Sequence, residues 1–181
     1  MRTIKLKEFD FKDLFSRNKV LPGPGTWFRL DAALAIGGRN PKWKYVGDYD
    51  FWLRLAMKGV LVHRESAVAQ WRHHSNSISI SERGYGMAME RIKVIAEFSE
   101  KFVELLDASE VSLAKANSYY QAAKLGFFSI EVNSRKLLMC ALRTDFRVLK
   151  DAKGYEILFM LLFPLSKKIV DTIKKFKIIR K

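Results

Sequence analysis

Residues 48–55 read Asp-Tyr-Asp-Phe-Trp-Leu-Arg-Leu, and this stretch decides the structure expected for the first half of the chain. Its apolar and aromatic residues recur at helical spacing, so we expect a helix over residues 49–58. Asp50 and Arg54 are four residues apart, a spacing that brings an acid and a base together on one face of a helix. Asp50 is therefore predicted to form a structural ion pair within this helix.

Short apolar runs, separated by glycine and proline, surround the predicted helix. Upstream, we expect a strand at residues 26–29 and a second helix at residues 31–36. Downstream, the pattern predicts two further strands, at residues 60–63 and 67–72. This mixture of strands and helices predicts an α/β fold for residues 1–81.

Beyond residue 81 the composition changes. Proline does not recur until Pro164, and apolar residues are spaced as on a helix, for example Ile92, Ile95 and Phe98. We therefore expect an all-helical C-terminal region over residues 82–181.

The last part of the chain combines an apolar run with a basic end. Residues 157–165 are almost purely apolar, but this window is far shorter than the roughly 20 residues of a membrane-spanning helix. One interpretation is a helix that lies on an anionic membrane surface, where each basic side chain contributes about 1 kcal/mol. The other is a core helix followed by a solvated basic end.

The net charge of +14 is unevenly distributed. Residues 1–81 carry 14 Lys/Arg and 7 Asp/Glu, residues 82–150 carry 11 and 9, and residues 151–181 carry 8 and 3. Such a basic chain suits a polyanionic partner, which includes nucleic acid, anionic lipid headgroups and phosphorylated substrates. The single cysteine, Cys140, excludes an intramolecular disulfide and a zinc site built on several cysteines.

Several short motifs follow one another between residues 21 and 79. They are a glycine-containing loop, a Phe-Arg segment, a helix ending in two glycines, an acidic pair opening an aromatic-rich helix, two strands and an aromatic-Arg-x-His motif. The residues concerned are Gly23 and Gly25, Phe28-Arg29, Gly37-Gly38, Asp48 to Leu55, and Trp71-Arg72-His73-His74. In this order they resemble the acceptor-side, C-terminal half of family 2 glycosyltransferases of the bacterial polysaccharide type. The resemblance covers about a third of the chain closely.

The resemblance implies an inverting enzyme that transfers a sugar from a nucleotide-sugar donor to a saccharide or lipid-linked acceptor. In the family, an acidic residue at the start of the aromatic-rich helix takes the proton from the acceptor hydroxyl, which assigns the role of catalytic base to Asp48. The alternative is that Asp48 is the N-cap of the helix that it precedes. The family usually has a glutamate just before this aspartate, where this chain has Gly47.

The resemblance also suggests residues for the donor side. His74 matches the histidine that completes a Mg²⁺ or Mn²⁺ site beside the diphosphate in metal-dependent relatives, or else it is a polar surface residue. Arg72 is expected to pair with a phosphate or with a buried acid. Gly23 and Gly25 either let the backbone approach the donor sugar or simply form a turn.

Two further residues are assigned to substrate binding. Arg29 belongs to the Phe-Arg segment, and Trp43 is the tryptophan that we consider the best candidate for an exposed sugar-stacking platform. The other tryptophans are expected in the core. Asp48-Tyr49-Asp50 also matches an Asp-x-Asp metal motif, but that motif follows a buried strand, whereas this string opens a helix.

Only 47 residues precede Asp48, which is too few for the nucleotide-binding βαβ units, at about 30 residues or more each. We therefore expect residues 1–81 to form a partial GT-A-like sheet with helices, followed by the helical region of residues 82–181. Such a chain would be inactive until a nucleotide-binding half is supplied, and it would not hold the divalent cation alone. A truncated sheet would also expose an edge and promote self-association.

Lipid-linked acceptors and the basic tail together predict a cytoplasmic protein that is peripheral at the inner face of the cell membrane. The alternative is a non-catalytic basic module that binds membrane or nucleic acid. The chain carries no recognisable nucleic-acid motif, and its basic residues are spread rather than striped, so no specific nucleic-acid partner is expected.

Overall fold

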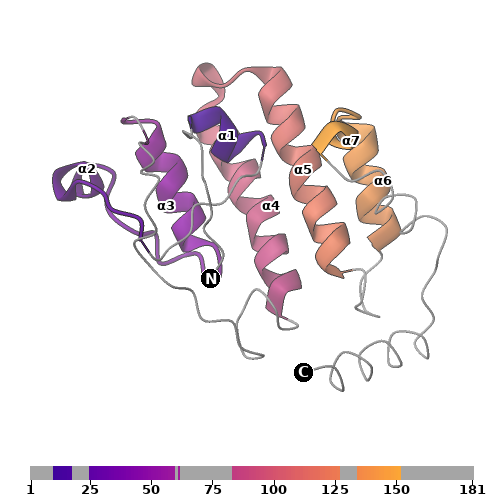
Figure 1. Ribbon diagram of the computed structural model, residues 1–181, viewed down its shortest axis with the longest axis horizontal. Coiled ribbons are helices and arrows are strands. Elements are labelled where there is room, and N and C mark those ends of the chain that lie inside the picture. The colour runs from indigo at the N-terminus through magenta and orange to yellow at the C-terminus, as the bar shows by residue number, and fades with distance from the viewer. Residues whose placement is uncertain (1–9, 18–24, 60, 62–82, 127–133, 152–181) are drawn as a thin grey trace.

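The computed structural model describes residues 10–17, 25–59, 61, 83–126 and 134–151 (Figure 1). Helices make up 72% of these residues, and they include no strand or sheet. The elements are α1 (Phe11–Phe15), α2 (Leu30–Ala35), α3 (Gly47–Ala56), α4 (Arg83–Lys101), the 3-10 helix η1 (Val103–Leu105), α5 (Ala108–Gly126), α6 (Ser134–Thr144) and α7 (Val148–Asp151). The expected α/β fold is therefore wrong for the part of the chain that is described.

Residues 26–29 show why the strand prediction failed. Arg29 has extended backbone, with φ −73° and ψ 131°, but it is the N-cap of α2 rather than part of a strand. Extended backbone is what an N-cap residue adopts, and a strand also needs a partner that local sequence does not reveal. The predicted strands at residues 60–63 and 67–72 lie outside the described residues, apart from Leu61.

The two short helices predicted in the first half are confirmed. The helix expected at residues 31–36 is α2, and the helix expected at residues 49–58 is α3. Both predictions rested on apolar spacing within a single element, which does not depend on distant contacts.

Two glycines end α2. Gly37 and Gly38 have φ values of 77° and 66°, in the left-handed region that glycine adopts without steric cost. The Gly38 N–H donates to the Ala33 carbonyl at 2.9 Å and the Gly37 N–H donates to the Leu34 carbonyl at 3.0 Å. These two bonds make a Schellman motif, which satisfies carbonyls at the helix end.

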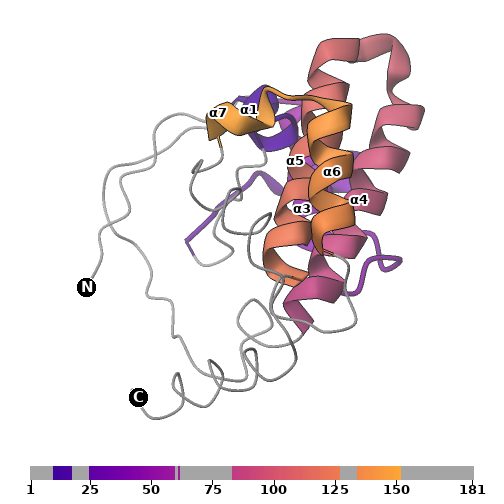
Figure 2. The same cartoon turned by 90° about the vertical axis from the view of Figure 1, so that its right-hand side faces the viewer.

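Four helices, α3 to α6, lie side by side in chain order (Figure 1). The two short helices α1 and α7 lie against one face of this layer (Figure 2). There, α1 contacts α3 and α5, while α7 contacts α5 and α6. The helices expected after residue 81 are thus present in the described part of that region, and residues 152–181 lie outside it.

One apolar core joins residues from both sides of the boundary expected near residue 81. It contains Phe15 of α1, Leu53 of α3, Ile95 of α4 and Ala114 of α5, each less than 2% exposed. Phe15 and Phe98 of α4 have ring centroids 5.7 Å apart. The first helices and the later ones therefore depend on each other's apolar surface.

Two buried hydrogen bonds fix α1, which at five residues is too short to persist alone. The Tyr49 hydroxyl of α3 donates to the Leu14 carbonyl at 2.9 Å. The Asn117 side-chain amide of α5 donates to the Ser16 carbonyl at 2.7 Å. Both bonds satisfy carbonyls near the end of α1 and connect it to the helices beneath.

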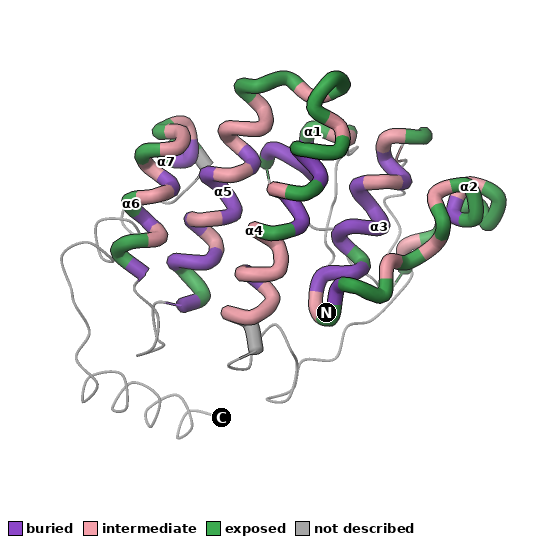
Figure 3. The backbone as a smooth tube through the Cα atoms, turned by 180° about the vertical axis from the view of Figure 1, so that it is seen from behind, coloured by how far each residue is buried: buried purple, intermediate pink, exposed green. Residues whose placement is uncertain are grey.

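A second core lies between α5, α6 and α7. Its fully buried members are Ala116, Ala123, Leu138, Ala141 and Val148. The small side chains on α5 let the neighbouring helices approach closely, and Figure 3 shows buried residues recurring along α5. None of the described helices has the length and apolar character needed to cross a membrane.

Candidate functional site

Asp48 lies in the first turn of α3 and its side chain is exposed. Its Oδ1 accepts the N–H of the next residue, Tyr49, at 2.8 Å. The N-cap position belongs to Val46, which makes no side-chain capping bond. Interpreting Asp48 as the N-cap is therefore wrong, and its carboxylate is at the surface at the start of the helix.

Asp50 has the structural role predicted for it. The Arg54 guanidinium donates to Asp50 Oδ2 from Nε at 3.0 Å and from a terminal nitrogen at 2.7 Å. The other terminal nitrogen donates to the Ile36 carbonyl at 2.6 Å, and the terminal nitrogen that pairs with Asp50 also donates to the Gly38 carbonyl at 2.9 Å. Arg54 thus joins α3 to the end of α2, a connection that sequence spacing alone did not indicate.

Glu90 of α4 holds the segment that leads into α3. Its carboxylate accepts the backbone N–H groups of Lys44 at 3.0 Å, Tyr45 at 2.6 Å and Val46 at 3.1 Å. Three bonds to a charged acceptor fix the direction in which the chain enters the helix. Glu90 was not predicted as a site residue, because it lies 44 to 46 residues from its partners and no local pattern marks such a contact.

An arginine lies where a side chain at position 47 would go. A Cβ built on Gly47 would be 2.8 Å from Nε of Arg39. A larger residue there would displace this guanidinium. Because Nε belongs to a flexible side chain that can move aside, this contact does not by itself require glycine at position 47.

The aromatic residues near α3 divide into buried and exposed groups. Phe28 packs on Phe51 and Trp52, with ring centroids 5.1 and 5.7 Å apart. Trp27, the residue before Phe28, is 86% exposed. Trp43 is only 7% exposed, so the expectation of an exposed platform at Trp43 is wrong.

A local signal for the burial of Trp43 exists in the sequence. Lys42 and Lys44 flank it and both are exposed, so the side chains alternate between solvent and core along this irregular segment. The indole joins the core of α1, α3 and α4, while its Nε1 has no hydrogen-bond partner. Among the three tryptophans that the structure describes, the exposed one is Trp27, which was expected in the core.

Arg29 and Gly25 lie at the surface in front of α2. Gly25 has φ 84°, in the left-handed region, as a turn or a close backbone approach requires. Arg29 is ion-paired with Asp31, and its guanidinium lowers the pKa of the Asp31 carboxyl by hydrogen bonding. The Arg29 side chain is 83% exposed, so it remains accessible to a ligand.

The remaining predicted site residues, Gly23, Arg72 and His74, lie outside the described residues. Their roles in donor and metal binding stay predictions. Within the described ranges, no group of three or more His, Cys, Asp or Glu side chains is arranged to hold a metal ion.

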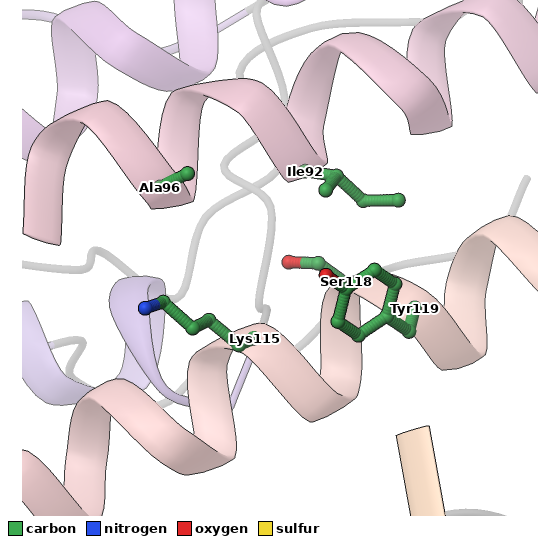
Figure 4. A pocket seen from close by; sticks show the side chains of 5 residues that line it. All are labelled: Ile92, Ala96, Lys115, Ser118 and Tyr119. Atoms are coloured by element: carbon green, nitrogen blue, oxygen red, sulfur yellow. The ribbon is translucent and has the colours of Figure 1, made fainter. Parts of the chain in front are cut away.

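A cavity of about 140 Å³ lies between α4 and α5 (Figure 4). Its lining residues are Ile92, Ala96, Lys115, Ser118 and Tyr119. Small-molecule sites usually have about 300 Å³ or more, so this cavity is too small for a nucleotide sugar. It belongs to the helix layer and contains none of the residues predicted for the site.

Of the predicted site residues that the structure describes, Asp48 presents an exposed carboxylate at the start of α3, Trp43 is buried, and Gly25 and Arg29 lie at the surface before α2. Searches against protein-family models, curated proteins and solved structures found no match to this chain.

Proposed function

We propose that this chain is the acceptor-side part of an inverting glycosyltransferase of family 2, with Asp48 as the base that deprotonates the acceptor hydroxyl. The observation that carries the proposal is the contrast between Asp48 and Asp50. Asp50 is neutralised by Arg54 and its side chain is 10% exposed, whereas Asp48 is exposed in the first turn of α3. A general base must come within about 3 Å of the attacking hydroxyl, which requires an accessible carboxylate.

Trp27 takes the place of Trp43 as the proposed sugar-stacking platform. Phe51 and Trp52 follow Asp48 by three and four residues, so the three side chains share one face of α3. Phe28 packs on that face and leaves its neighbour Trp27 exposed. An exposed indole attached to the same helix face as the carboxylate suits a saccharide acceptor, because sugar C–H faces pack on aromatic rings.

The donor in this proposal is a nucleotide-activated sugar, with Mg²⁺ or Mn²⁺ at the diphosphate. The residues proposed for the donor side are Gly23, Gly25, Arg72 and His74, and Arg29 is proposed to bind substrate. The cavity between α4 and α5, at about 140 Å³, is too small for such a donor, and the proposal places the donor in a nucleotide-binding half supplied elsewhere.

We further propose that the chain works at the inner, cytoplasmic face of the cell membrane as a peripheral protein. The support is the basic C-terminal sequence, with 8 Lys/Arg against 3 Asp/Glu in residues 151–181. A non-catalytic membrane-binding module is the second candidate, because the exposed face of α6 is also basic.

Glycan binding tests the acceptor side. An array of immobilised oligosaccharides is probed with the wild-type chain, Trp27→Ala, Asp48→Asn and the matched control Leu34→Ala. Leu34 is 69% exposed on α2 and carries no aromatic ring. We expect Trp27→Ala to weaken binding about tenfold, which corresponds to about 1.4 kcal/mol, and the other two variants to bind as wild type.

Failure of every glycan to bind, or equal binding by Trp27→Ala, would contradict the acceptor-site assignment. Calorimetric titration with UDP-, GDP- and dTDP-sugars and Mn²⁺ tests the donor side. We expect no binding to this chain alone. Metal-dependent binding that weakens in His74→Ala would show that the donor site is on this chain and that the proposed division into halves is wrong.

A further inference from the structure

The outward face of α6 is the most prominent surface that the proposed glycosyltransferase site does not use. This helix is the last of the layer, and it contacts α5 and α7 (Figure 1). Its buried residues, Ser134, Leu138 and Ala141, lie on the side that packs inward. With 3.6 residues per turn, the opposite side is formed by four exposed residues. They are Arg135, Lys136, Met139 and Arg143.

This face is basic and carries no acid. The sequence of α6, residues 134–144, contains three Lys/Arg and no Asp or Glu. The next acid along the chain, Asp145, has a side chain that is 8% exposed. Its carboxylate accepts from Nε of Arg147 at 3.0 Å, so it does not offset the charge of the α6 face.

Large apolar side chains are exposed beside these basic residues. Phe146, in the turn after α6, is 71% exposed, Leu149 of α7 is 46% exposed and Met139 is 40% exposed. Lys150 is exposed next to Leu149. A helix face that simply faces solvent would account for the basic residues. It would not account for the exposed phenylalanine, Phe146, in the turn that follows them.

The combination of charges and apolar side chains favours a lipid surface over nucleic acid. Basic residues attract phosphate in either partner. Leucine and methionine side chains, however, gain stability at the boundary between headgroups and acyl chains, and they contribute nothing to contacts with phosphates. An anionic bilayer therefore complements both parts of this surface.

We propose that the outward face of α6 and the turn into α7 dock on an anionic bilayer. In this arrangement Arg143 and Lys150 contact the phosphate headgroups, and Phe146 enters the interface as an apolar anchor. This inference rests on the proposed membrane association, and it adds a surface in the folded part of the chain to the basic sequence of residues 151–181.

Sedimentation of the full-length chain with vesicles tests the surface. The vesicles consist of phosphatidylcholine with or without phosphatidylglycerol. We expect the wild-type chain to bind the anionic vesicles, and Arg143→Glu/Lys150→Glu to bind them roughly 10- to 30-fold more weakly, from about 1 kcal/mol for each basic residue lost. Phe146→Ser should weaken binding about tenfold, because the anchor no longer leaves water.

The matched control is Lys58→Glu/Lys93→Glu. It changes the net charge by the same amount at two exposed lysines. Lys58 follows α3 and Lys93 lies on α4, both away from α6 in the layer. We expect this pair to weaken binding less than about threefold, since charges beyond a Debye length of about 10 Å are screened. Thermal unfolding of each variant verifies that the exposed substitutions leave the fold intact.

Three outcomes would overturn the inference, and they differ in meaning. If the wild-type chain binds no anionic vesicle, the proposed membrane association fails as well. If it binds but the control pair loses as much affinity as the α6–α7 pair, net charge explains the binding and only the surface assignment fails. If Arg143→Glu/Lys150→Glu weakens binding to random-sequence DNA and leaves binding to vesicles unchanged, the surface binds nucleic acid.

Discussion

The α2–α3 region, residues 25–59, and the α5–α6 pair are stabilised in different ways. The α5–α6 pair packs through small and aliphatic side chains such as Ala123, Leu138 and Ala141, all fully buried. By contrast, α2 buries only Ala33, and its position depends on Arg54 and on the rings around Phe28. A regular helix pair is held by its apolar faces, whereas an irregular segment needs specific polar contacts at its ends.

This difference matters because the candidate site lies in the irregular region. Glu90 holds the backbone of the segment just before Asp48, and Arg54 connects α3 to the end of α2, both without using the Asp48 carboxylate. The carboxylate therefore stays accessible while its position is fixed. Polar contacts from neighbouring helices allow this, because they do not cover the surface as apolar packing does.

The largest expected effect comes from removing apolar packing between α5 and α6. Leu138 is fully buried between α5 and α6, and Leu138→Ala should lower the free energy of unfolding by about 2–5 kcal/mol. The control Leu34→Ala, at a residue 69% exposed on α2, should change it by no more than about 0.5 kcal/mol. Urea denaturation measures both. Similar losses for the two variants would mean that α2 packs against more of the chain than its exposure indicates.

A smaller effect is expected on the polar side. Glu90→Ala leaves three backbone N–H groups without their acceptor and should destabilise the chain by about 2–3 kcal/mol. Glu97→Ala on the same helix removes only an exposed ion pair with Lys42, for which about 0–1 kcal/mol is expected. Equal losses in urea denaturation would show that Glu90 acts as an ordinary surface charge, and the polar frame of α3 would then need another explanation.

The smallest expected effect is a pH dependence of stability that comes from Tyr49 in the α2–α3 region. Burial raises the pKa of Tyr49, against the opposing effect of the nearby Arg91 charge. In the unfolded chain, the Tyr49 hydroxyl ionises near pH 10. The stability that comes from keeping Tyr49 neutral in the fold is therefore complete below that pH, and it is lost as the pH rises through the pKa of Tyr49 in the folded chain.

Tyr49→Phe should therefore be about 1 kcal/mol less stable at neutral pH, because the Leu14 carbonyl loses its donor. The difference from the wild-type chain should narrow above about pH 10. Thermal unfolding across this range measures it, with Tyr119→Phe on α5 as the control that keeps Tyr49. If the stability difference between the two proteins stays constant with pH, the pKa of Tyr49 is the same in the folded and the unfolded chain, and the raised pKa is contradicted.

Sequence reasoning found part of the candidate site. The Asp50–Arg54 pair and the glycine end of α2 were both predicted, and each depends on residues at most a few positions apart. The choice between Trp27 and Trp43 was wrong. Hydrophobicity does not tell which of two tryptophans is covered, although the lysines on either side of Trp43 give a signal of alternation.

The sequence by itself determined where α2 and α3 form, the helical character of the described part after residue 81, how α2 ends and which aspartate pairs within α3. These features arise from spacing within one element, where backbone geometry brings neighbours together. Only the tertiary structure decided that residues 26–29 lead into a helix instead of a sheet, that Trp27 is exposed and that Glu90 fixes the entry to α3. Each of these depends on which distant surface covers a segment, and no local pattern encodes that.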